Sequence, residues 1–64
     1  MEINTNLILN YMKEHGLGRA DFCKLCKIEN ETLDKIFGQD FDFDISALFK
    51  IARVLDLEVC QLFA

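Results

Sequence analysis

Residues 18–37, GRADFCKLCKIENETLDKIF, decide the fold of this chain. Apolar side chains recur every three to four residues in each half of the stretch, the spacing of a helix with one buried face. The two stripes consist of Phe22, Cys23 and Cys26, then Ile28, Leu33, Ile36 and Phe37. The period loses phase at Lys27-Ile28, and Asn30 is a plausible N-cap for a second helix. The stretch therefore predicts two short helices joined by a tight turn, the plan of a helix-turn-helix unit.

A further helix is expected before this pair. It begins on a cap at Asn4 or Thr5 and runs to about His15, where Gly16 stops it. Gly18 can serve as the next N-cap. Asp21 then suits the first turn of the following helix, because a carboxylate there interacts favourably with the helix dipole.

Two more helices are expected after Gly38. The intervening segment QDFDFD alternates Asp and Phe, but it is too short for a partnered strand and is interpreted as a loop in which Phe43 packs on the core. Asp44 is a good N-cap for a helix over residues 45–55. That helix is expected to bury Ile45, Leu48, Ile51, Ala52 and Leu55. Asp56 tolerates the left-handed conformation that ends it, and residues 57–63 form a last short helix.

These elements predict an all-α fold, with five short helices around one core. A chain of 64 residues is one domain, 1–64, near the lower size at which a chain folds alone, and its 52% apolar content is enough for a small helical core. Phe22, Leu33, Leu48 and Ile51 form the meeting faces of the middle helices, so we expect them to be almost fully buried.

Three segments of the chain resemble the lambda-repressor-like domains, also called Cro-type or XRE helix-turn-helix domains. They are HGLGRADFCKLCKI, ETLDKI and ISALFKIARVLDLEVCQLF, and together they extend the resemblance from about Asn6 to Phe63. The last segment is the most specific, because it closely follows the family's fourth and fifth helices. Lys27 departs from the pattern, since such domains usually carry Gly where the backbone takes a positive φ. Glu29 stands where the family favours a Ser or Thr cap, which points to Asn30 as the cap instead.

The resemblance implies a small DNA-binding transcriptional regulator whose helix near residues 30–37 enters the major groove of duplex DNA. Arg19 would lie near a phosphate, and Glu29, Asn30, Glu31 and Lys35 would face the groove. Asn can pair with adenine, Lys with guanine, and Glu can accept from the amino group of cytosine.

The charge of the chain counts against DNA binding and leaves an alternative open. The formal net charge is −4, whereas phosphate neutralisation by Lys and Arg supplies most non-specific DNA affinity. From Arg19 to Lys35 four basic residues face four acidic ones, and the acidic excess lies elsewhere, notably at Asp40, Asp42 and Asp44. The alternative is a protein–protein interaction module on the same fold that does not bind DNA, such as an antitoxin-like or regulator-binding protein.

More large apolar residues are present than a domain of this size can bury. The surplus consists of Leu9, Leu25, Phe41, Phe49, Val54 and Phe63. We expect Phe49, Val54, Val59 and Phe63 to form one patch that a second copy covers, which makes the protein a homodimer. The two DNA-reading helices would then lie about 34 Å apart, one turn of DNA. The alternative is that the loop phenylalanines and the last helix cover this patch within one chain.

Other chemistry is not expected. Cys23 and Cys26 form a Cys-x-x-Cys that could join Cys60 and His15 in a zinc set, but the remaining spacing matches no common finger. Reduced cysteines that act as small packing residues are the favoured interpretation, with no metal and no cofactor. No catalytic constellation is recognised, so an enzyme is not expected. The chain lacks both a membrane-length apolar run and the basic start of a signal peptide, and we expect a cytoplasmic protein.

Overall fold

Residues 2–63, which the computed structural model describes, form four α-helices and a terminal 3-10 turn. The helices are α1 (Thr5–Glu14), α2 (Arg19–Cys26), α3 (Asn30–Phe37) and α4 (Ser46–Leu55), and the turn is η1 (Val59–Leu62). The all-α prediction is confirmed. The last expected helix is a single 3-10 turn rather than an α-helix over residues 57–63. Met1 and Ala64, the two ends of the expected domain, lie outside the described residues.

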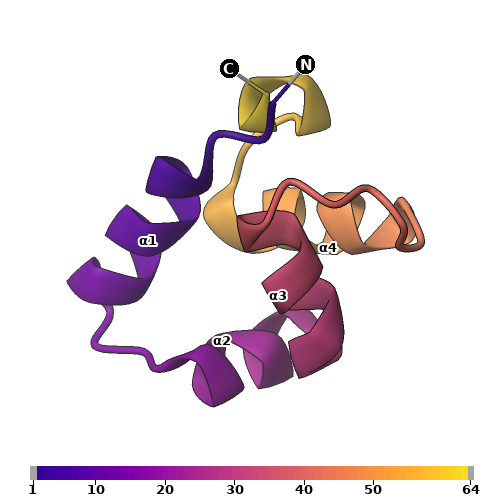
Figure 1. The fold of residues 1–64 in the computed structure, drawn as a ribbon. Helices are drawn as coiled ribbons and strands as arrows, with labels where there is room; N and C mark the ends of the chain where they lie inside the picture. Colours follow the sequence, from indigo (N-terminus) through magenta and orange to yellow (C-terminus); the bar gives the residue numbers. More distant parts are fainter. Residues whose placement is uncertain (1, 64) are drawn as a thin grey trace.

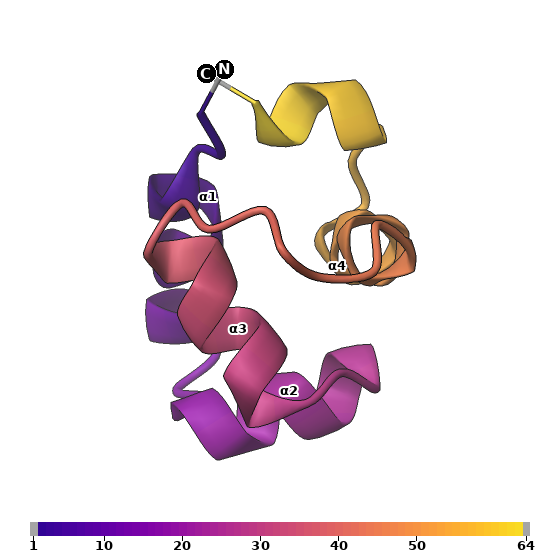
Figure 2. The same ribbon diagram turned by 45° about the vertical axis from the view of Figure 1, so that its right-hand side comes forward.

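The helices surround the core rather than lying in layers. In Figure 1, α1 occupies one side, α2 lies at the bottom, and α3 stands between α1 and α4. Figure 2 shows α4 nearly end-on, with the loop after α3 passing over to it. The two ends of the chain meet at the top of both views, where Ile3 and Phe63 form an antiparallel bridge and the Asn4 N–H donates to the Leu62 carbonyl at 2.6 Å.

The predicted core is confirmed. Phe22, Leu33, Leu48 and Ile51 are all at most 1% exposed. Partly buried residues pack around them, among them Phe43, as expected, and Leu55, which was expected to be buried. Ile3, which the helical pattern did not mark, is also buried against the core.

Ile45 contradicts the expected inward face of α4. Its side chain is 62% exposed, although it stands three residues before the buried Leu48. The helix begins at Ser46, and Ile45 is the N-cap at the end of α4 that extends past the core. The prediction of Asp44 as the N-cap is therefore wrong by one residue, although its Oδ1 accepts the Ser46 N–H at 2.9 Å. Ile45 therefore precedes the first helical residue, and the helical spacing did not show whether it is buried.

Glycines end or open the first helices as predicted. Gly16 takes a φ of +63° just after α1, whose C-cap is His15, and Gly18 is the N-cap of α2. The Gly18 N–H donates to the Asp21 Oδ2 at 3.4 Å, so the carboxylate in the first turn also contributes to the cap. At the other end of the pair, Gly38 is the C-cap of α3, while Gln39 takes the left-handed conformation at φ 58°.

Gln39 joins the end of α3 to the start of the chain. Its Oε1 accepts the Ile3 N–H at 2.8 Å, and its Nε2 donates to the Ile3 carbonyl at 3.0 Å. One side-chain amide thus satisfies both backbone groups of a residue 36 positions away, as a neighbouring strand would. No helix within residues 2–63 is long and apolar enough to cross a membrane.

Candidate nucleic-acid interface

The turn between α2 and α3 is formed by Lys27, Ile28 and Glu29. Lys27 takes the left-handed conformation, with φ 60° and ψ 46°, which Gly adopts without steric cost. Its N–H donates to the Lys24 carbonyl at 3.3 Å, and the Ile28 N–H donates to the Cys23 carbonyl at 3.0 Å, so both bonds close the end of α2. The structure therefore retains the positive φ at Lys27 despite the side chain, at a cost of about 1 kcal/mol.

The start of α3 differs from the prediction by one residue. Glu29, not Asn30, occupies the N-cap position, with extended dihedrals and no capping hydrogen bond from its side chain. The prediction of Asn30 as the cap is therefore wrong, and Asn30 is the first helical residue. The backbone turn after Lys27 sets where the helix begins, and it outweighs the local preference of Asn for a cap.

The buried and exposed faces of α3 are clearly separated. Leu33 and Ile36 are buried in the core, and Phe22 and Cys23 of α2 meet them there. The opposite face carries Glu29, Asn30, Glu31 and Asp34, all exposed, together with the partly exposed Thr32, Lys35 and Phe37. The predicted groove-facing residues thus share the accessible side of α3 and its N-cap.

Arg19 pairs with an acidic residue of α3. Its Nη1 forms an ion pair with the Asp34 Oδ1, and both side chains remain more than half exposed. Its guanidinium also lies over the Phe37 ring, 4.9 Å from the centroid, a cation–π arrangement. Arg19, which was predicted to contact a phosphate, therefore contacts two side chains of α3, Asp34 and Phe37.

Lys35 is held in a similar way. Its Nζ donates to the Asp42 carbonyl at 2.8 Å and lies 3.6 Å from the Glu31 Oε1, one helical turn earlier. Its side chain is only 30% exposed, while that of Glu31 is 76% exposed. Both cations predicted to contact DNA thus already have partners within the chain.

Sequence reasoning missed these partners to different degrees. The Glu31–Lys35 pair has the i,i+4 spacing that a helix brings together, so it could have been anticipated. The Arg19–Asp34 pair and the Lys35–Asp42 bond join different elements, and only the packing of α2, α3 and the following loop shows them. No periodic signal in the chain marks Asp34 or Asp42 as partners.

The four residues of the expected dimer patch differ in how exposed they are. Phe49 is exposed, whereas Val54, Val59 and Phe63 are half-buried and pack against the core. Phe49 and Val59 line one groove between α4 and η1 with Ala52, Arg53, Leu57, Glu58 and Cys60, and Val54 and Phe63 are not part of that lining. Phe49 and Val54 are five residues apart, which places them about 140° apart around α4, on opposite edges of its buried stripe.

The cysteines are free thiols in two environments. Cys23 and Cys26 are buried, as expected of packing residues, and Cys60 is exposed. Burial, with a smaller contribution from Cys23, raises the pKa of the Cys26 thiol to about 11. Burial, and to a smaller extent the charge of Asp34, raises the pKa of the Cys23 thiol, while the charge of Arg19 lowers it. The Cys23 Sγ also lies 3.9 Å from the Glu29 carbonyl oxygen, to which it is a weak donor. Within residues 2–63, no three His, Cys, Asp or Glu side chains gather where they could hold a metal ion.

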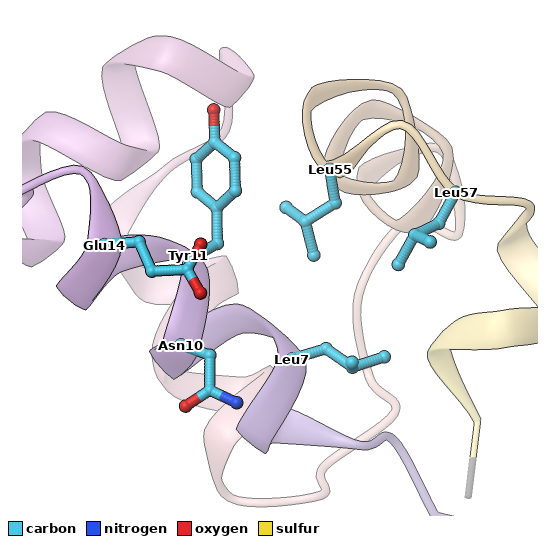
Figure 3. Close-up of a pocket in the computed structure, with 6 residues that line it drawn as sticks. All are labelled: Leu7, Asn10, Tyr11, Glu14, Leu55 and Leu57. Atoms are coloured by element: carbon cyan, nitrogen blue, oxygen red, sulfur yellow. The ribbon is translucent and has the colours of Figure 1, made fainter.

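A second surface feature lies between α1 and α4. Figure 3 shows Leu7, Leu55 and Leu57 facing a shallow hollow, with Tyr11 beside them and Asn10 and Glu14 at its rim. The leucines offer apolar contact, and the amide and the carboxylate offer polar contact at one edge only. The six lining residues include no nucleophile beside a base.

The accessible face of α3 therefore offers one amide, one partly exposed lysine and three carboxylates, with an arginine at its edge. Such a face carries hydrogen-bonding groups, and its net charge is negative. Comparisons with protein-family models, with curated proteins and with solved structures found no match for this chain.

Proposed function

We propose that this protein is a small cytoplasmic DNA-binding transcriptional regulator of the lambda-repressor-like type, which binds duplex DNA through α3. The observation that carries the proposal is the α2–turn–α3 unit. Two eight-residue helices are joined through a left-handed Lys27, one side of α3 is buried, and the other side is free for a groove. In a helix-turn-helix unit, the second helix can lie in the major groove while the first contacts the backbone, and these features support that use of α3.

Base contacts would come from the start of α3. Asn30 is exposed in the first turn, and its amide can make the paired hydrogen bonds that adenine presents in the major groove. Lys35 follows in the last turn, and its ammonium can pair with guanine once it leaves both the Asp42 carbonyl and Glu31. Glu29 and Glu31 would select cytosine among the bases, because a carboxylate can accept a hydrogen bond from its amino group and repels other hydrogen-bond acceptors.

The internal ion pairs lower the affinity but do not prevent binding. An exposed pair such as Arg19–Asp34 contributes about 0–1 kcal/mol, because water screens it and two side chains are ordered to form it. A phosphate can replace such a carboxylate as the partner of the guanidinium. We therefore expect weak binding by one subunit and useful affinity from a homodimer with two α3 helices on the DNA.

The paired cations favour a second candidate function. With Arg19 held by Asp34 and Lys35 held by Glu31 and Asp42, the accessible face of α3 presents acidic groups to a partner. Such a face suits a basic protein surface better than a phosphate backbone. The second candidate is therefore a protein–protein interaction module on the same scaffold.

The deciding experiment is a fluorescence anisotropy titration of labelled random duplex DNA, repeated over a series of salt concentrations. Wild-type protein should bind at low salt with a steep salt dependence. Arg19→Glu and Lys35→Glu should weaken binding, and Glu31→Gln should strengthen it. Lys13→Glu on α1 is the matched control, because it makes the same charge change outside the α2–α3 pair.

The two candidate functions give opposite results in this assay. If α3 binds DNA, the Lys13→Glu protein should lose less affinity than the Arg19→Glu and Lys35→Glu proteins. No binding at low salt, even by the Glu31→Gln protein, would refute the DNA-binding proposal and favour the interaction module.

A further inference from the structure

The groove between α4 and η1 combines apolar walls with two charges of opposite sign. We call it the α4–η1 groove, and its lining consists of Phe49, Ala52, Arg53, Leu57, Glu58, Val59 and Cys60. Figure 2 shows η1 lying over α4, with the short segment after Leu55 joining the two. The groove has a volume of about 560 Å³, within the roughly 300–1,000 Å³ of small-molecule sites. It therefore has room for a small organic ligand.

Most of the lining of the groove is apolar. Ala52 is 3% exposed, and its small side chain leaves space beside its larger neighbours, while Phe49 is 59% exposed. Leu57 and Val59 contribute partly buried aliphatic side chains from the residues that follow α4. Covering an exposed aromatic ring with an apolar group is favourable, because both surfaces leave water. The groove thus suits a ligand with an aliphatic or aromatic side chain.

Arg53 and Glu58 supply the charges of the groove. Arg53 lies in the last turn of α4, Glu58 is the N-cap of η1, and both are exposed. In the part of the chain that the structure describes, neither of them forms an ion pair. The Glu58 N–H donates to the Gln61 Oε1 at 2.8 Å, which holds the backbone that carries the carboxylate. A guanidinium binds a carboxylate through paired hydrogen bonds, and a carboxylate accepts from an ammonium group.

The neighbouring charged residues leave this balance unchanged. Asp56 is the C-cap of α4 and does not line the groove. The Lys50 ammonium donates to the Lys27 carbonyl, at the turn before α3. Arg53 and Glu58 are therefore the two charged residues of the lining, and their formal charges sum to zero. The groove favours a ligand that also carries one positive and one negative group.

We propose that the α4–η1 groove binds a free apolar amino acid. The Arg53 guanidinium donates to the carboxylate of the ligand, and the Glu58 carboxylate accepts from its ammonium group. The side chain of the ligand covers the Phe49 ring. A fatty acid leaves Glu58 without a partner and an alkylamine leaves Arg53 without one, so the two charges together select a zwitterion.

This site goes beyond the proposed function and does not rest on it. No lining residue belongs to α2 or α3, and the test uses no DNA. The proposal gives Phe49 and Val59, two residues of the expected dimer patch, a role in ligand binding. Failure of the ligand site and failure of DNA binding therefore appear in separate experiments.

The first test is an NMR titration of the isotope-labelled full chain with L-leucine, repeated with L-phenylalanine. Backbone amides of residues 49–60 should shift, and those of α1 should not. Isocaproate has the leucine skeleton without the ammonium group, and isoamylamine has it without the carboxylate. Each should bind about three- to fivefold more weakly than leucine, the effect of losing one exposed ion pair.

The second test assigns each charge of the ligand to its partner. Arg53→Gln should bind leucine and isoamylamine about equally, because the carboxylate no longer has a partner. Glu58→Gln should likewise bind leucine and isocaproate about equally. Lys13→Gln and Glu14→Gln make the same charge changes on α1 and should keep the wild-type preference for leucine. All four residues are exposed, and the amide spectrum of each variant without ligand should show the wild-type fold.

Four outcomes would overturn the proposal. The first is that neither amino acid shifts the amides of the groove. The second is equal binding of leucine, isocaproate and isoamylamine by the wild type, since this result excludes recognition of a zwitterion. The third is that Arg53→Gln and Glu58→Gln keep the preference of the control variants. The fourth is a shift of the same amides with protein concentration alone, which would show that a second copy covers the groove.

Discussion

Replacing Leu48 by Ala tests the packing of the core most directly. Leu48 lies in the middle of α4 and is 1% exposed, in a cluster with Phe22, Leu33 and Ile51. The change removes three carbon atoms from a site that is enclosed on all sides. The neighbours are held by their own helices, so they can close the space only in part.

The expected loss of stability is large for this protein. A buried Leu→Ala change lowers the free energy of unfolding by about 2–5 kcal/mol, since it combines lost transfer energy with a residual cavity. At about 0.05–0.15 kcal/mol per residue, a domain of this length is stable by roughly 3–10 kcal/mol. The change therefore removes a substantial share of the total, and the melting temperature should fall by roughly 10–40 °C.

The assay is thermal unfolding followed by far-ultraviolet circular dichroism, with urea unfolding as a second measurement. Leu25→Ala provides the control, because it deletes the same atoms from a side chain that is 48% exposed on α2. That variant should lie within about 0.5 kcal/mol of the wild type. The difference between the two variants then measures burial, because the chemical change is identical.

Equal effects of the two substitutions would refute this reasoning. If Leu48→Ala melted at the wild-type temperature, α4 could not present Leu48 to the core. If Leu25→Ala were as damaging as Leu48→Ala, the outer side of α2 could not be exposed.

Three other changes test the turn, the chain ends and the thiols. The free energy of unfolding should be about 0.5–1 kcal/mol higher for Lys27→Gly than for Lys27→Ala, because only Gly adopts φ 60° without strain. Gln39→Ala should lower the free energy of unfolding by about 1–3 kcal/mol, since the N–H and the carbonyl of Ile3 lose their partner. Amide hydrogen exchange near Ile3 should become faster. The Cys26 thiol has a folded pKa of about 11 against a usual 9.0, so its contribution to stability should be full below pH 9 and lost as the pH rises toward 11.

Each of these changes has its own control. At Asp56, also left-handed at φ 59°, substitution by Gly and by Ala should reproduce the difference measured at Lys27. Gln39→Glu retains an acceptor for the Ile3 N–H but loses the donor, so it should fall between the wild type and Gln39→Ala. Cys26→Ala, which removes the buried thiol, should flatten the alkaline unfolding profile. Opposite orders of effect would contradict the assigned contacts.

Local chemistry in the chain was enough to predict most of the helices. Gly16 follows the end of α1 and Gly18 caps the start of α2, as the sequence predicted, because positive φ and capping are properties of one or two residues. The apolar period predicted the buried positions Phe22, Leu33, Leu48 and Ile51, since the repeat of a helix sets which side chains share a face. The residues expected to face DNA on α3 came instead from the resemblance to the lambda-repressor-like domains.

Tertiary structure determined the features that apolar periodicity does not predict. Ile45 follows the inward spacing of α4 yet is exposed, because spacing gives a direction around a helix and not the place where the core ends. Gln39 binds Ile3, and Arg19 binds Asp34, across separations of 36 and 15 residues. These contacts depend on how the helices pack, and they determine which cations are already paired on the proposed DNA-binding face. The sequence by itself determined the helices and their faces, and only the packing decided the partners and the exposed edge of α4.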